Sequence, residues 1–151
     1  DGDGNLNNWW TESDRKNFDA KGGQLAAQYD KYEPVKGSFV NGNFTSGENI
    51  GDFGGINVAY TALQMYLKDH GNPGKISGLT QDQRFFMSWA TVWRTKSTDK
   101  YMTNQVKTDP HSPGYFRSFG PLVNMEAFQK AFDVKPGDKL YVAPENRIKI
   151  W

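Results

Sequence analysis

One long helical repeat constrains the fold of this chain more than any other feature. From Thr45 onward, apolar residues return at spacings of three, four and seven positions: Ile56, Ala59, Tyr60, Leu63 and Leu67. This spacing places them on one face of an α-helix, which needs a packing partner. The repeat ends at "DHGNPG" (residues 69–74), whose glycines and proline stop helices. The sequence therefore predicts a long helix from Thr45 to the start of this segment.

Two further helices are predicted. Thr11 is a suitable N-cap for a helix over residues 11–32, which ends before a Glu-Pro pair because the residue preceding proline avoids helical geometry. Thr80 and Gln83 form a capping box in front of a helix over residues 79–95. Together with the long helix, these segments make the chain mainly α.

The intervening segments are predicted to hold loops and a few short strands. Residues 35–44 are typical of a strand–turn–strand unit around Asn41-Gly42. Residues 97–123 contain three prolines and are predicted to be irregular. Asn124 is expected to cap a short helix that runs to residue 132. A functional site in such a chain would be carried largely by loops.

Composition excludes several classes of function. The chain has 151 residues, enough for one domain with a core, and its net charge of +1 gives no electrostatic basis for binding nucleic acid or an acidic membrane. It holds no cysteine, which excludes disulfides, iron–sulfur clusters and cysteine nucleophiles. No apolar run is long enough to span a bilayer. Because the chain does not begin with methionine and opens on "DGDGNL", we expect it to be a fragment of a longer protein or a processed product.

Two carboxylates, Glu48 and Asp52, stand one turn apart on the long helix. In one interpretation, Thr45 and Glu48 form a capping box, and Asp52 is a second acid favoured by the helix dipole. In the other, one carboxylate binds a zinc ion and the other accepts a hydrogen bond from a histidine that also binds the metal. Capping boxes are common, so the pattern alone favours the first interpretation, but both remain open.

The start of the chain offers a different cation site. The ligand positions of a calcium-binding loop are matched by Asp1, Asp3, Asn5, Asn7 and Glu12. Leu6 stands where the sharp turn of such a loop needs glycine, and no helix precedes it. These two departures from the pattern argue against a calcium site.

Several segments resemble one family, the neprilysin-type zinc metallopeptidases, which include bacterial oligopeptidases. "FTSGENIGDFGG" (residues 44–55) resembles the family signature G-E-N-x-x-D-x-G-G, and "DPHSPGYFR" (109–117) resembles its D-x-H-S-P-x-x-F-R block. Residues 3–18, residues 79–93 and the closing Ile150-Trp151 also look like family segments, in the same order. The resemblance covers essentially the whole chain. It implies the C-terminal portion of a mainly α, thermolysin-like (zincin) catalytic domain over residues 1–151.

The resemblance also implies roles for individual residues. Glu48 would be the third protein ligand of a catalytic zinc ion, and Asp52 would orient one of the histidine ligands. His111 would donate a hydrogen bond to the oxyanion of the tetrahedral intermediate. Asp109, two residues before His111, is our own candidate for tuning that histidine.

The resemblance also implies which residues would bind the substrate. Arg117 would hold the substrate backbone on the leaving-group side. Val92 and Trp93 would wall a pocket for a bulky apolar side chain. The expected activity is that of a zinc-dependent endopeptidase, which hydrolyses oligopeptides on the N-terminal side of bulky hydrophobic residues.

The chain departs from the family pattern in one decisive respect. The H-E-x-x-H motif, which supplies two zinc ligands and the general base, is absent, and the only histidines are His70 and His111. We therefore expect this chain alone to be inactive and to expose apolar surface that promotes self-association. The alternative is a non-catalytic relative that binds peptides. The lack of cysteines favours a bacterial member, expected in the cytoplasm, with a secreted or cell-surface location left open.

Overall fold

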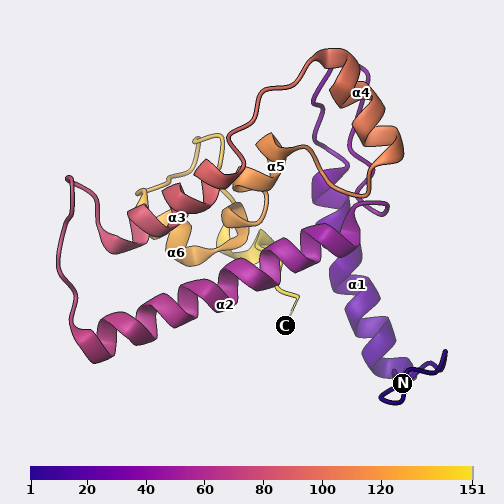
Figure 1. The fold of residues 1–151 in the computed structure, drawn as a ribbon, viewed down its shortest axis with the longest axis horizontal. Coiled ribbons are helices and arrows are strands. Elements are labelled where there is room, and N and C mark those ends of the chain that lie inside the picture. The colour runs from indigo at the N-terminus through magenta and orange to yellow at the C-terminus, as the bar shows by residue number, and fades with distance from the viewer. Residues whose placement is uncertain (151) are drawn as a thin grey trace.

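Helices dominate the structure, a computed structural model that describes residues 1–150 (Figure 1). Trp151, half of the closing pair noted above, lies outside the described residues. In chain order the helices are α1 (Glu12–Tyr29), α2 (Ser46–His70), α3 (Gln81–Val92), α4 (Asp99–Thr108), α5 (Gly114–Phe119), the 3₁₀ turn η1 (Leu122–Asn124), α6 (Glu126–Ala131) and the 3₁₀ turn η2 (Pro144–Asn146). Within residues 1–150 the strand-like pairings are two isolated bridges, Val35–Ser38 and Ile76–Leu79.

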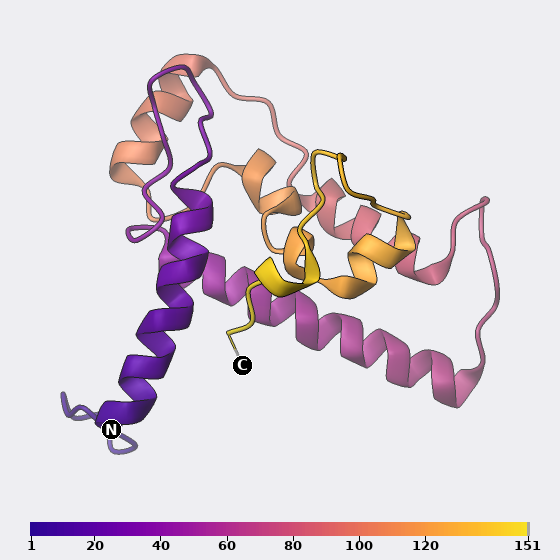
Figure 2. The ribbon, with the colours of Figure 1, turned by 180° about the vertical axis from the view of Figure 1, so that it is seen from behind.

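The long helix α2 organises the other elements. In both views α1 meets α2 near its N-terminal end, whereas α3, α5 and α6 lie together along one side of it (Figures 1 and 2). The core forms where these helices meet, and the ring of Phe86 on α3 packs edge-on against Phe128 on α6 at 5.6 Å. The N-terminal turns of α2 therefore lie where α1 and the later helices converge.

None of the helices within residues 1–150 combines the length and apolarity needed to cross a membrane.

Two of the predicted helix starts are confirmed in atomic detail. The hydroxyl of Thr11 accepts a hydrogen bond from the backbone N–H of Asp14 at 3.1 Å. At α3, Thr80 accepts from the backbone of Gln83, and the Gln83 side chain accepts from the backbone of Thr80, so the capping box is complete. Both motifs are local, which is why the sequence alone was sufficient to find them.

The predicted capping box at the start of α2 is wrong. Thr45 makes no side-chain cap bond there, and its hydroxyl instead donates to the carbonyl oxygen of Asn41 at 2.9 Å. Glu48 is consequently not used as a helix cap. The long helix itself is confirmed, and it ends at His70, before Gly71 with φ +84°.

The predicted strand–turn–strand unit around Asn41-Gly42 is wrong: residues 42–45 form a turn, but it leads into α2, and the strand-like bridge of this segment joins Val35 to Ser38. Gly42 instead packs directly on α1. A Cβ at this position would overlap the carbonyl group of Ala26, and the Gly42 N–H donates to Asp30 at 2.6 Å. The glycine therefore serves a close approach between chain segments and not a hairpin.

Two predictions in the second half of the chain need correction. Residues 97–123 are not irregular throughout, since Thr98 caps α4 by accepting from the backbone N–H of Tyr101. Asn124 is not an N-cap, because α6 begins at Glu126. The side chain of Asn124 is buried instead, and it accepts from the backbone N–H of Ile148 at 3.0 Å.

Candidate active site

The first turns of α2, the loop before α5 and α5 itself supply the polar residues of the site. Glu48 and Asp52 project from α2 one turn apart, and both lie close to Arg117 on α5. The two carboxylates differ in accessibility: the Glu48 side chain is 46% exposed and the Asp52 side chain 10%. His111 lies in the loop between α4 and α5. Two sequence-distant segments thus meet at one end of α2.

His111 is held between two carboxylates. Its Nδ1 atom lies 2.6 Å from Oδ1 of Asp109, and its Nε2 atom lies 3.2 Å from Oε2 of Glu48. Because a carboxylate only accepts, Nδ1 is the donor towards Asp109. The same Asp109 oxygen accepts from the backbone N–H of His111 at 2.9 Å. This backbone bond, followed by the bond from the ring, holds the pKa of the Asp109 carboxyl below its usual range.

Arg117 forms a two-point ion pair with Asp52. Its Nε and Nη2 atoms donate to the two carboxylate oxygens at 2.6 and 2.7 Å, and its side chain is only 12% exposed. Nη2 also lies 3.7 Å from Oε2 of Glu48. The guanidinium sits over the ring of Trp93, with Cζ 3.9 Å from the ring centroid. Sequence reasoning placed these residues in one site but missed the pairing.

The two predicted pocket residues have different surroundings. Val92 is exposed and lines a shallow pocket of about 240 Å³ between α2 and α3, together with Ile56, Phe85 and Trp89. Trp93 does not line this pocket, because it lies under the Arg117 guanidinium. Trp89 was missed as a site residue, and its indole N–H donates to the carbonyl oxygen of Arg117 at 3.0 Å. An aromatic stripe on a helix gives no signal that separates such a residue from the core.

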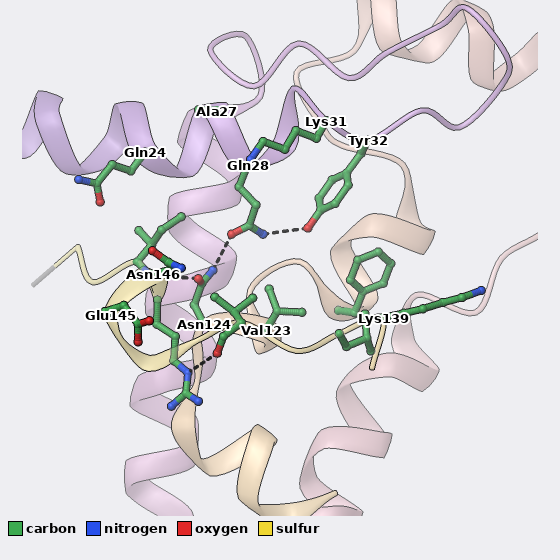
Figure 3. Close-up of a pocket in the computed structure, with 15 residues that line it drawn as sticks. Gln24, Ala27, Gln28, Lys31, Tyr32, Val123, Asn124, Lys139, Glu145 and Asn146 are labelled. Atoms are coloured by element: carbon green, nitrogen blue, oxygen red, sulfur yellow. Dashed lines mark hydrogen bonds between the residues drawn. The ribbon is translucent and has the colours of Figure 1, made fainter. Parts of the chain in front are cut away.

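A larger pocket, of about 650 Å³, lies elsewhere, between α1 and the segment that leads to η2 (Figure 3). None of the seven predicted site residues lines it. Its central polar side chains are already paired: Gln28 donates to the hydroxyl of Tyr32 and accepts from Asn124, as the dashed lines in Figure 3 show. Size alone therefore does not mark it as the functional site.

The described residues fit one zinc ligand and not a full set. Residues 1–150 hold no group of three or more histidine, cysteine, aspartate or glutamate side chains arranged to bind a metal ion. Glu48 is accessible and free of helix capping, and a carboxylate oxygen is an accepted zinc ligand. A metal at Glu48 would need its other ligands from outside this chain.

Comparison with known proteins identifies the family. The profile of peptidase family M13 matches residues 1–148, and the chain belongs to that family. It is 40% identical over 155 residues to neprilysin-11 of Caenorhabditis elegans, covering 100% of this chain and 18% of that protein. It is 38% identical over 151 residues to the neutral endopeptidase of Lactococcus lactis, covering 100% of this chain and 22% of that protein. The chain thus spans about a fifth of the length of these relatives.

Solved structures agree with this assignment. The inhibitor complex of the Mycobacterium tuberculosis zinc metalloprotease Zmp1 superimposes with a TM-score of 0.92 at 46% identity, over 100% of this chain and 24% of that one. PepO of Lactobacillus rhamnosis gives a TM-score of 0.82 at 34% identity, over 98% and 22%. The predicted family and the mainly α, zincin-type fold are therefore confirmed.

Removing Asp52 should cost more stability than removing the ion pair as a whole. Asp52→Ala leaves the Arg117 guanidinium largely buried without its carboxylate, and such one-sided loss costs about 3–5 kcal/mol in free energy of unfolding. In denaturant unfolding we expect that loss for Asp52→Ala and a smaller one for Asp52→Ala combined with Arg117→Leu.

The exposed pair Arg15–Asp19 provides the control, since both of its side chains are more than half exposed. Asp19→Ala should cost no more than about 1 kcal/mol. Equal losses for the single and the double variant at Asp52 and Arg117 would contradict the interpretation of this pair as a buried, mutually dependent unit.

Proposed function

We propose that the protein to which this chain belongs is a zinc-dependent endopeptidase that hydrolyses oligopeptides on the N-terminal side of bulky hydrophobic residues. The observation that carries the proposal is the grouping of Glu48, His111 and Arg117 at one end of α2. The Glu48 carboxylate lies accessible, 3.2 Å from His111 and 3.7 Å from Arg117. Membership of family M13 supports the class of reaction.

Glu48 would provide one protein ligand for the zinc ion, and this chain by itself would be inactive. When bound, zinc polarises the scissile carbonyl and lowers the pKa of the attacking water. The remaining ligands and the general base would come from the rest of the protein. Asp52 keeps lone pairs beyond those used by Arg117, so it can also accept a ring N–H from a histidine ligand.

His111 would act on the tetrahedral intermediate. The Nδ1–H group of His111 donates to Asp109, and Nε2 is directed towards Glu48 and the site. Nε2 can donate to the developing oxyanion only when the ring carries both protons. A donor placed in this way stabilises the transition state more than the bound substrate.

Arg117 and the apolar pocket would position the peptide. The Asp52 carboxylate and the Trp93 ring hold the Arg117 guanidinium, and its partly free Nη2 edge can donate to a substrate carbonyl. The pocket lined by Val92 and Trp89 is apolar and shallow, which suits one large hydrophobic side chain. An occupied pocket of this kind would favour cleavage before such residues.

The proposal is tested on the full-length protein with two matched peptides. The peptides differ only in the residue after the scissile bond, which is phenylalanine in one and alanine in the other. We expect kcat/KM on the order of 10–100-fold higher for phenylalanine, because the apolar pocket gains contacts in the transition state. Treatment with a chelator should abolish cleavage of both, and zinc should restore it. Cleavage that survives complete zinc removal, or no cleavage by the zinc-loaded protein, would contradict the proposal.

A further inference from the structure

A fully buried chain of polar side chains runs beside the site. Asn49 on α2 and Ser112 in the loop before α5 are 0% and 1% exposed, and Thr45 is 1% exposed. The hydroxyl of Ser112 donates to Oδ1 of Asn49 at 2.9 Å, and Nδ2 of Asn49 donates to the hydroxyl of Thr45 at 2.9 Å. Thr45 in turn donates to the carbonyl oxygen of Asn41. Every link has a defined donor and acceptor.

The positions of these hydrogen-bonded side chains in the sequence are informative. Asn49 directly follows Glu48, and Ser112 directly follows His111. The Ser112–Asn49 bond therefore joins the backbone that carries Glu48 to the backbone that carries His111, across 63 residues of sequence.

The direct contact between Glu48 and His111 is a weaker restraint. The two side chains are 46% and 43% exposed, and their closest atoms are 3.2 Å apart. Solvent screens such a contact, and exposed pairs contribute little to holding a geometry. A buried hydrogen bond is more restrictive, because breaking it leaves a desolvated polar group without a partner.

We propose that Asn49 and Ser112 are positioning residues that fix the placement of His111 relative to Glu48. The inference rests on the proposed function, since it assigns the buried bond a role in catalysis through His111. Neither side chain reaches the substrate, because both are buried. Their effect on the reaction comes from the ring position they impose, and a displacement of about 1 Å at a reacting group can cost on the order of 10²-fold in rate.

The test is a set of variants of the full-length, zinc-loaded protein. Ser112→Ala should lower kcat on the order of 10–100-fold, with little change in KM and with zinc content unchanged. In a His111→Ala background the same substitution should leave kcat almost unchanged, because the group it positions is already gone. An equal loss of kcat in both backgrounds, or no loss in the parent, would overturn the proposal.

Two further variants keep the test sharp. Ser112→Cys has nearly the same volume and a weak S–H donor, so it should fold and give a smaller loss of kcat than Ser112→Ala. Ser118→Ala removes a hydroxyl that donates only to Tyr115 within α5, and it should leave kcat at the parental value. A loss for Ser118→Ala equal to that for Ser112→Ala would overturn the assignment.

A crystal structure of the Ser112→Ala variant separates this proposal from the proposed function. We expect the His111 ring to lie farther from Glu48 than in the parent. An unmoved ring would overturn the positioning role whether or not the parent is a peptidase. A displaced ring in a parent without peptidase activity would support the positioning link and contradict only the proposed function.

Discussion

Glu48→Gln in the full-length protein is expected to abolish zinc retention and peptide hydrolysis together. An amide is neutral and a much poorer zinc ligand than a carboxylate. The loss of zinc affinity should therefore exceed the roughly 10–100-fold weakening expected when a residue that hydrogen-bonds to a ligand is removed. The fold should survive, because Glu48 is 46% exposed and its contacts are weak. Metal analysis after gel filtration, combined with a peptide assay, measures both effects.

The matched control for this substitution is Glu126→Gln. Glu126 lies on the surface of α6, and its one ion pair among residues 1–150 is with Lys130, four residues away. This variant should keep the parental zinc content and activity. A Glu48→Gln protein that retained zinc at the parental level would show that Glu48 is not a ligand.

His111→Ala is expected to lower kcat by on the order of 10²–10³-fold while leaving zinc bound. That factor is typical for the loss of one oxyanion donor. Zinc should remain because the carboxylate of Glu48, and not the histidine, is the proposed ligand from this chain. Steady-state kinetics should show the loss mainly in kcat, since the donor acts on the transition state.

His70 provides the control for this variant. It is the other histidine of the chain and lies at the exposed C-terminal end of α2, where it stacks on Tyr66. His70→Ala should keep parental kinetics. A His111→Ala enzyme with parental kcat would contradict the oxyanion role. A His111→Ala protein without zinc would show that His111 is itself needed to retain the metal.

Local signals explain what the sequence predicted correctly. The long helix and the caps at Thr11 and Thr80 depend on residues within a few positions of one another, so pattern rules apply. The family rested on several motifs in a fixed order, and its profile covers residues 1–148. Helix α4 was missed because the three prolines of residues 97–123, which all follow α4, led us to predict that the whole region was irregular, and these prolines outweighed the short capped segment before them.

Long-range contacts explain what the sequence did not predict. Thr45 and Glu48 have the spacing of a capping box, yet buried Thr45 is drawn into bonds with Asn41 and Asn49, which local pattern rules do not weigh. The pairing of Asp52 with Arg117 spans 65 residues, and the residues next to either one in the sequence do not indicate it. The placement of His111 against Glu48 depends in the same way on how α5 packs beside α2.

The central claim is that the carboxylate of Glu48 is a ligand of a zinc ion. Diffraction data collected on both sides of the zinc absorption edge, from crystals of the full-length protein, locate zinc without any assumption about activity. The account predicts one strong anomalous peak in contact with the Glu48 carboxylate, on the side that faces His111. A zinc peak elsewhere with Glu48 unliganded, or no peak in protein that hydrolyses peptides, would contradict it.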